Sequence, residues 1–425
     1  MPAWVQIASS LANSCLQPCF MLVARLLSND WESISEFAER GATVNKSRSM
    51  PSTPVLGFAF ILTGMGVAFL GPVLPLLSRQ WSLTDATSGL LPAAQFLGIF
   101  IGSITVFSRL ERSFVLGLLA SALGFAGFAL SFGWVLSCGA LLVACWGLGQ
   151  VMTSTNLIMG ARYTARRGAA LSSFNFVWGL GAILSPLLIS WLSPFVPLPR
   201  LLLGFAMLFG LAVVACVIEP KAAAVSPNAP RAPAMPSTYR VPAAVFFFFA
   251  TCFVVYGGFE ASMNVWITTY MFRYGGKSLF AGQSAATLFW ISLTMSRGIG
   301  SLLLLRMGER RLQRAAIAAA ACALTALILV HGGMAIAICT VLTGISASVI
   351  FPLISSQMMS WSPASRQAGT MMAVSSLGNA AWPWLIGVVS QVSGSLRIAF
   401  LLPLLAVFGL IVLFGRTPVP PISAE

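Results

Sequence analysis

The stretch Tyr256-Gly-Gly-Phe-Glu-Ala-Ser-Met-Asn-Val-Trp266 lies inside an apolar segment, residues 243–270, that can cross a bilayer as a helix. It contains Glu260, the only acidic residue well inside any such segment. Tyr256, Glu260 and Asn264 are spaced four apart, so on a helix they form one polar stripe. A carboxylate at membrane depth costs about 2.5–3.5 kcal/mol on insertion scales and by default marks a functional site.

The composition of the chain predicts many more membrane segments. Of the 425 residues, 58% are hydrophobic and only 8% are charged, whereas a soluble domain carries about 25% charged residues. Apolar segments long enough to span as helices are expected near 54–78, 87–108, 113–132, 134–161, 169–192, 200–218, 243–270, 284–305, 314–331, 334–359, 369–392 and 397–415. We therefore predict an all-α membrane protein with twelve transmembrane helices.

The basic residues predict the orientation. With the N-terminus inside, eighteen of the 24 Lys and Arg residues fall on the inner side. Five fall on the outer side, namely Arg79, Arg200, Arg273, Lys277 and Arg397. The positive-inside rule then predicts an inner or plasma membrane protein with both termini in the cytoplasm. The net charge of +14 is explained in this way without a nucleic-acid partner.

The chain also divides into two similar halves. Residues 220–242 are rich in Pro and Ala, which is typical of a flexible linker. Ile101-Gly-Ser103 and Glu111-Arg112 recur 198 positions later as Ile299-Gly-Ser301 and Glu309-Arg310. We therefore expect two pseudo-symmetric six-helix halves, 51–219 and 243–416, the linker between them cytoplasmic and followed by a cytoplasmic tail, 417–425. Two six-helix halves in parallel repeat are the arrangement of the major facilitator fold.

Residues 1–50 differ from the rest, because they hold four of the ten acidic residues. They are interpreted as a cytoplasmic or interfacial extension. The alternative is that translation begins at Met50 and that residues 1–49 are a start-site artefact.

The sequence contains few of the residues that metal sites, nucleophilic catalytic triads and nucleotide-binding sites require. His331 is the only histidine, and six of the eight cysteines fall within apolar runs. Metal sites and nucleophilic triads need clusters of such residues at accessible spacings, and no nucleotide-binding Gly-x-x-x-x-Gly-Lys-Ser/Thr sequence is present. We expect no catalytic residues, no metal and no cofactor, so the protein is not expected to be an enzyme.

Residues 54–415 resemble the major facilitator superfamily, and several stretches are similar to the sugar-permease branch that includes the fucose permease and sodium-dependent glucose carriers. These stretches are Tyr256-Gly-Gly-Phe-Glu-Ala-Ser…Trp266, Phe289-Trp290…Ser296-Arg297-Gly298-Ile-Gly300, Phe174-Asn175…Gly179-Leu-Gly181 and Ala94-Gln95-Phe96-Leu97-Gly98. The resemblance implies a secondary transporter whose two halves rock around a central cavity.

The chain departs from the proton-coupled members of that branch. They carry an acid on the first helix and a glutamate on the fourth, whereas here residues 55–77 have no acid and Met152 stands at the glutamate position. Val106 occupies the place of the superfamily's loop aspartate. The N-terminal half therefore lacks a coupling carboxylate, which leaves Glu260 as the in-membrane acid available for coupling.

Glu260 and Arg297 are the predicted coupling or gating residues. Glu260 could carry a coupled proton, accept hydrogen bonds from a solute, or form a buried ion pair with Arg297. The alternative is that it forms only a structural hydrogen bond between helices. Arg297 alternatively satisfies backbone carbonyls or acts in gating. Hydrogen-bonding and aromatic residues predicted to contact the solute are Gln95, Gln150, Asn156, Asn175, Tyr256, Asn264, Trp266, Trp290 and Asn379. Amides in membrane helices also serve simply as contacts between helices.

The sequence thus predicts a secondary active or facilitative transporter working by alternating access. Amides hydrogen-bond hydroxyls and tryptophans stack on sugar rings, so the leading solute is a monosaccharide-like neutral compound. The candidate coupling ions are H⁺ and Na⁺. The alternative is efflux of hydrophobic drug-like compounds. A bilayer-embedded monomer is expected.

Overall fold

All twelve predicted segments fall on helices in the computed structural model. It describes residues 51–107, 109–131, 133–163, 167–218, 241–276, 279–304, 307–361, 365–416 and 418. The predicted extension 1–50, nearly all of the predicted linker 220–242 and most of the predicted tail lie outside these residues. Within them, ten helices are long and apolar enough to span a membrane, or eleven if one bent pair counts as a span.

The helices form two groups, which we call the N-terminal and C-terminal groups. The N-terminal group comprises α4 (Thr53–Ala68), α5 (Leu70–Gln80), α6 (Asp85–Ser88), α7 (Leu90–Ile104), α8 (Leu110–Leu130), α9 (Trp134–Arg162), α10 (Arg167–Leu192) and α11 (Leu198–Ile218). The C-terminal group comprises α12 (Ala243–Tyr274), α13 (Leu279–Leu304), α14 (Glu309–Leu329), α15 (Gly333–Ala347), α16 (Ile350–Met359), α17 (Ser365–Ala373), α18 (Ser375–Ser393), α19 (Leu396–Ala399) and α20 (Leu401–Phe414). Helix α13 coincides with the predicted segment 284–305 but is not among the ten that pass the length and hydropathy test.

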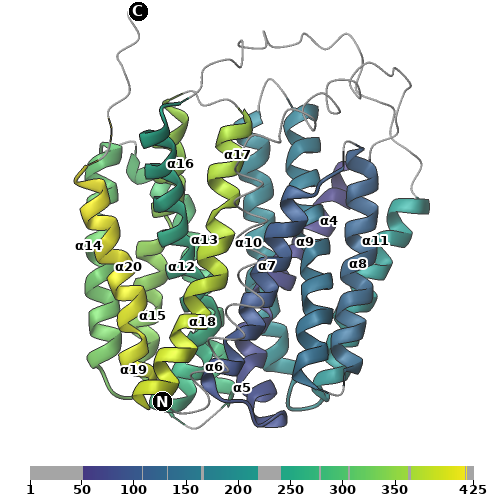
Figure 1. The fold of residues 1–425 in the computed structure, drawn as a ribbon, viewed down its shortest axis with the longest axis horizontal. Helices are drawn as coiled ribbons and strands as arrows, with labels where there is room; N and C mark the ends of the chain where they lie inside the picture. The colour runs from purple at the N-terminus through teal and green to yellow at the C-terminus, as the bar shows by residue number, and fades with distance from the viewer. Residues whose placement is uncertain are drawn as a thin grey trace, which may run out of the picture. The chain divides into compact units, whose positions relative to one another are not determined.

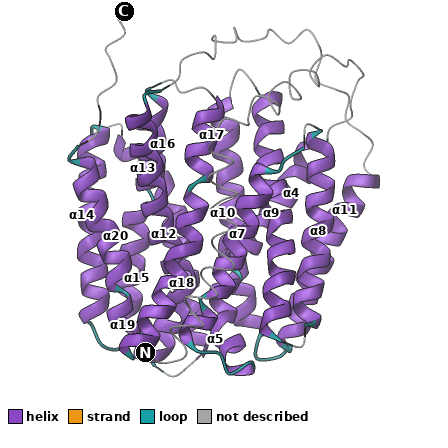
Figure 2. Ribbon diagram, viewed as in Figure 1, coloured by secondary structure: helices purple, strands orange, loops and turns teal. Residues whose placement is uncertain are grey.

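The two groups lie side by side, with purple to teal helices on one side of Figure 1 and green to yellow helices on the other. Where they meet, α10 packs on α13, α7 on α18, and α5 on α12. The described residues contain helices, turns and loops (Figure 2). Many large apolar side chains on the helices remain exposed, as expected for surfaces that contact lipid.

Two predicted segments are broken by proline. Helices α4 and α5 meet at an angle of 44° at Phe69. Pro72 has no N–H to donate to the carbonyl of Ala68 four residues earlier, and its ring crowds that carbonyl. Pro352 stands in the same relation to Ser348, where α15 ends before α16 begins. Proline therefore interrupts the hydrogen-bond ladder in both spans.

Close helix contacts depend on small residues. A Cβ added to Gly64 of α4 would lie 2.1 Å from the carbonyl oxygen of Trp178 on α10, whereas one added to Gly57 of the same helix would meet nothing within 4 Å. The absence of a side chain at Gly64 is therefore what allows α4 and α10 to approach.

We expect Gly64→Ala to destabilise the protein by about 1–3 kcal/mol or more, because the new methyl group forces the two backbones apart. Gly57→Ala is the matched control, and it should be neutral or stabilising because alanine favours a helix over glycine. Thermal unfolding of both variants in detergent tests this, and equal midpoints would contradict it.

Candidate functional site

A cavity of about 950 Å³ lies between the two groups of helices. This volume is near the upper end of the ~300–1,000 Å³ typical of small-molecule sites. Its wall is formed by α4, α7, α9 and α10 of the N-terminal group and by α12, α13, α16, α17 and α18 of the C-terminal group. A solute in this cavity would therefore touch both groups.

Seven of the predicted site residues line this cavity. They are Asn156, Asn175, Glu260, Asn264, Trp290, Arg297 and Asn379. They come from α9, α10, α12, α13 and α18, which are far apart in the chain. Folding thus gathers the four predicted asparagines, a tryptophan and the two in-membrane charges around one space.

Four other predicted site residues lie in the packed interior, outside the lining. Gln95 donates through Nε2 to the carbonyl oxygen of Val67 at 2.8 Å, and Gln150 donates through Nε2 to Thr105 Oγ1 at 3.0 Å. Trp266 Nε1 donates to the carbonyl of Pro383 at 2.8 Å. Tyr256 is also buried, but it bonds to a lining residue. The first three therefore act as contacts between helices in this structure.

Tyr256 and Glu260 are joined as the predicted polar stripe requires. The Tyr256 hydroxyl lies 2.5 Å from Glu260 Oε2 and 3.1 Å from the carbonyl oxygen of Ala347. A hydroxyl donates one proton, so the nearer carboxylate oxygen is the preferred acceptor. The ion pair between Glu260 and Arg297 stays a prediction.

Asn264, the third member of the stripe, closes one end of the cavity. Its Oδ1 accepts a 2.9 Å hydrogen bond from Trp290 Nε1, and its Nδ2 donates to the carbonyl oxygen of Val67 on α4 at 3.3 Å. Trp178 of α10 packs edge-on against Trp290, with ring centroids 5.6 Å apart. The amide and the aromatic pair therefore link the two groups at the end of the cavity.

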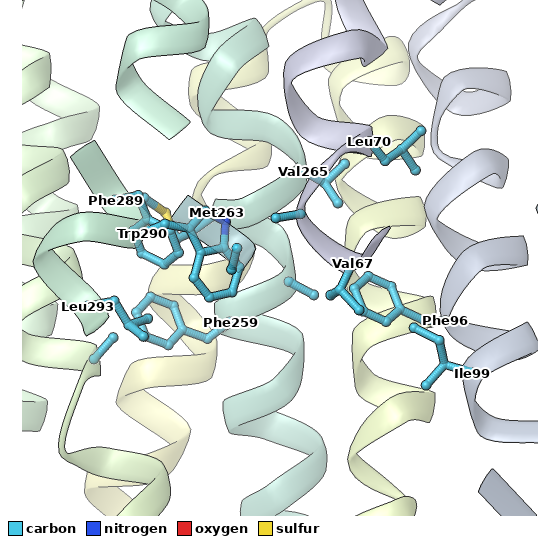
Figure 3. Close-up of a cluster of buried hydrophobic side chains, with 14 of the residues drawn as sticks. Val67, Leu70, Phe96, Ile99, Phe259, Met263, Val265, Phe289, Trp290 and Leu293 are labelled. Atoms are coloured by element: carbon cyan, nitrogen blue, oxygen red, sulfur yellow. The ribbon is translucent and has the colours of Figure 1, made fainter. Parts of the chain in front are cut away.

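Figure 3 shows the buried side chains around this point. Trp290 lies against Met263 and Phe289, and Val67 lies beside Phe96 on the other side of the view. Trp290 is therefore packed against neighbouring side chains on its buried side, while another part of it faces the cavity.

Asn379 both lines the cavity and forms hydrogen bonds between helices. In the amide orientation that satisfies its surroundings, its nitrogen donates to the carbonyls of Gly257 at 2.7 Å and Ser375 at 3.2 Å. It thereby holds α18 against the Tyr256–Glu260 region of α12.

Three further lining residues hold buried polar atoms without a hydrogen-bond partner among the described residues. These atoms are Trp178 Nε1, Thr294 Oγ1 and Ser355 Oγ. A buried polar group without a partner costs about 1–3 kcal/mol, which a solute or water in the cavity would remove. Sequence reasoning did not place them in the site. The spacing of Trp290, Thr294 and Arg297, at i, i+4 and i+7, could have identified Thr294 as sharing their helix face.

The cavity occupies one half of the helix length, and contacts between the groups close the other half. Lining residues extend to Leu171 near the start of α10 and to Met359 at the end of α16. At the opposite end Arg273 donates to both carboxylate oxygens of Asp85 at 2.7 and 2.5 Å, and Ser390 donates to Asp85 at 2.6 Å. Gln283 of the C-terminal group donates to the carbonyl of Pro72 at 3.3 Å. The structure is thus closed at the end that carries Asp85.

The family model described as Major Facilitator Superfamily matches residues 56–340. The chain belongs to this superfamily. The predicted family, the all-helical membrane fold and the absence of enzymatic activity are therefore confirmed, since members of the superfamily are transporters. This member of the Major Facilitator Superfamily is a multi-pass membrane transporter of a small solute.

Solved structures support the fold. A D-xylose-proton symporter has a TM-score of 0.70 and 13% identity, covering 88% of this chain and 98% of that one. A variant of the E. coli fucose:proton symporter FucP has a TM-score of 0.58 and 17% identity, covering 86% and 98%. A bacterial homolog of the human lysosomal transporter Spinster, inward-facing and occupied, has a TM-score of 0.66 and 14% identity, covering 86% and 96%. At these identities the likeness shows the fold alone. A comparison with curated proteins finds no match.

Proposed function

We propose that this protein is a secondary transporter that moves a small neutral polyhydroxylated solute, such as a monosaccharide, by alternating access. The observation that carries the proposal is the cavity wall, where four asparagines surround a space bordered by Trp178 and Trp290. Amides donate to and accept from hydroxyl groups, and a tryptophan offers an apolar face to the C–H face of a sugar ring. The fold shared with xylose and fucose symporters agrees with this substrate class.

The proposed orientation makes this an inward-facing state. The positive-inside rule predicts that the end with Arg162, Arg167 and Arg310 is cytoplasmic. The cavity lies in the half of the bundle toward that end, and the end with Asp85 and Arg273 is closed. Rocking of the two groups would open the latter end and close the former.

Coupling to protons is proposed for the Tyr256–Glu260 pair. Glu260 borders the cavity and has a hydrogen-bonded neighbour in Tyr256, whereas no acidic residue of the N-terminal group lines the cavity within the described chain. A proton bound at Glu260 and a solute bound in the same cavity would affect one another directly.

The second candidate is efflux of hydrophobic compounds. It is favoured by the apolar part of the wall, which includes Phe60, Phe96, Met152, Phe351 and Met359. Flexible methionines and aromatic rings accommodate varied apolar shapes.

Flux in proteoliposomes separates the two candidates. We expect uptake of labelled neutral monosaccharides such as D-xylose and L-fucose, and we expect Trp178→Phe to weaken it about five- to tenfold, because the unpartnered indole N–H is removed while an aromatic ring remains. Trp191→Phe, at an exposed position on the same helix outside the cavity, is the control. No flux of any monosaccharide, together with raised drug tolerance of expressing cells, would favour efflux instead.

A further inference from the structure

A second pocket lies away from the solute cavity, between the start of α14 and the end of α20. Its volume is about 230 Å³, and its wall consists of Arg310, Gln313, Arg314, Phe414 and Gly415. One water molecule needs only ~15 Å³ of such space, so the pocket has room for a phosphodiester group. Figure 1 shows α14 and α20 side by side at the edge of the C-terminal group.

The pocket is built for negative charge. Arg310 and Arg314 lie one turn apart on α14, and both are exposed. Arg314 Nε donates to the carbonyl oxygen of Arg310 at 3.3 Å, which holds the second arginine against its own helix. The first turn of α14 also presents backbone N–H groups, because its N-cap, Gly308, offers no side-chain cap.

A buried amide adds an independent observation. Gln313 is 2% exposed and lines the pocket, and its Nε2 has no hydrogen-bond partner among the described residues. Its Oε1 accepts from Gln357 Nε2 of α16, which leaves the nitrogen as the unsatisfied donor. An oxyanion in the pocket would satisfy this donor.

Two nearby features oppose an anion, and each carries less charge than the two arginines together. Glu309 is adjacent, but its Oε1 already accepts a 2.9 Å hydrogen bond from Ser356. The last carbonyls of α20 also point to this region. A helix end carries a partial charge of about −0.5, whereas the two guanidinium groups each carry a full positive charge.

The position of the pocket at the ends of two membrane-spanning segments favours a lipid headgroup as the source of the phosphate. The segments Glu309–Leu329 (α14) and Leu396–Phe414 (α19 and α20 together) are each long and apolar enough to span the membrane, and the pocket lies where α14 begins and α20 ends. Exposed apolar side chains continue along α20 from this end at Val412, Phe408, Leu405 and Leu401, spaced as one helix face. They would contact the acyl chain of a lipid whose headgroup occupies the pocket.

We infer that Arg310, Arg314 and Gln313 form a binding site for the phosphate of an anionic phospholipid such as phosphatidylglycerol. The site is independent of the transported solute. Under the predicted orientation it faces the cytoplasmic leaflet, where each basic residue near an anionic surface strengthens attraction about fivefold.

The test uses the purified full-length chain in nanodiscs of phosphatidylcholine alone and of an equal mixture with phosphatidylglycerol, with bound lipid identified by native mass spectrometry. The wild type should retain phosphatidylglycerol in preference to phosphatidylcholine. Arg310→Gln with Arg314→Gln should weaken this retention by about 25-fold, at about fivefold for each charge. Arg311→Gln is the matched control, because Arg311 is also exposed at the start of α14 but does not line the pocket.

The results of this experiment distinguish a lipid headgroup from a soluble phosphate, and three results would refute the proposed lipid site. No preference of the wild type for phosphatidylglycerol refutes it without reliance on any variant. An equal loss in the double variant and in Arg311→Gln also refutes it, because the effect would then be general surface charge. If inorganic phosphate displaces phosphatidylglycerol from the protein in the mixed discs, or protects the protein against heat in phosphatidylcholine discs as well as phosphatidylglycerol does, the site binds a soluble phosphate and the lipid assignment is wrong.

Discussion

Replacing Glu260 with glutamine is expected to abolish solute accumulation driven by a pH gradient while leaving exchange of solute across the membrane. Glutamine keeps the shape of glutamate but cannot release a proton. A gradient of one pH unit is worth about 1.4 kcal/mol per proton, which supports at most about tenfold accumulation by one-proton symport. The variant should therefore fall from about tenfold accumulation to none, and counterflow of labelled solute should continue.

A substitution of Tyr256, the hydrogen-bonded neighbour of Glu260, should have a smaller effect than Glu260→Gln. Tyr256→Phe keeps the carboxylate but removes the hydroxyl that lies 2.5 Å from it. A hydrogen bond to a charged group contributes about 1.5–3 kcal/mol, so we expect slower transport with coupling retained. Glu111→Gln, in the first turn of α8 and outside the cavity, is the control and should transport normally.

Proteoliposomes assayed with and without an imposed pH gradient, and then for counterflow, discriminate the roles. Accumulation that survives in Glu260→Gln would show that the proton is carried elsewhere. Loss of both accumulation and counterflow would mean that Glu260 is chiefly a hydrogen-bonding wall for the solute. If Glu260→Gln and Arg297→Gln each lose transport and the double variant recovers neither stability nor function, the predicted ion pair loses its main support.

The positions of the helices were predictable because a membrane span is a local property of the chain. An apolar run of sufficient length must become a helix in lipid, since its backbone groups have no other hydrogen-bond partners there. The Tyr256–Glu260 contact was predictable for the same reason, because residues four apart meet on any helix. Proline at 72 and 352 contained the signal for the breaks at Phe69 and near Ser348.

The composition of the cavity wall was only partly predictable, because it depends on how each helix is rotated against its neighbours. Gln95 and Asn175 are both amides within apolar helices, yet Gln95 is buried against the backbone of α4 while Asn175 borders the cavity. In a helix that is apolar nearly all round, one amide does not indicate which face meets lipid, another helix or the cavity. Small residues such as Gly64 determine which helices approach closely, and the partner of Gly64, Trp178, lies more than a hundred residues away in the chain.

Replacing Asp85 with asparagine is expected to shift the protein toward the state that is open at the end now closed. Asp85 of the N-terminal group accepts from Arg273 and Ser390 of the C-terminal group, and the contact must break when the groups separate there. The side chains of Arg273 and Asp85 are 38% and 17% exposed, so solvent screens the pair in part. A partly exposed bidentate pair of this kind contributes about 1 kcal/mol, which is about a fivefold change in population.

Spin labels at Gln80 on α5 and Ser393 on α18 would report this change, since both positions are exposed, near the ends of their helices, and belong to different groups. In a cysteine-free background, Asp85→Asn should increase the population of a longer distance between the labels. The charge-reversed pair, Asp85→Arg with Arg273→Asp, should restore much of the short distance, because the attraction is rebuilt with the partners exchanged. Arg200→Gln removes a basic residue that is exposed at the start of α11 and makes no contact with Asp85, so it should change nothing.

Linkage connects this contact to transport. A solute on the predicted outer side can bind only to the state that is open there. Its apparent affinity is therefore reduced in proportion to the fraction of the protein that occupies that state. Asp85→Asn weakens the contact that holds this end closed and so raises the population of the state open there. The apparent affinity for solute should therefore increase from the outer side and decrease from the inner side, with the contacts inside the cavity unchanged. A variant that lowered affinity equally from both sides, with an unchanged distance distribution, would mean that Asp85 supports the fold and does not bias the two states.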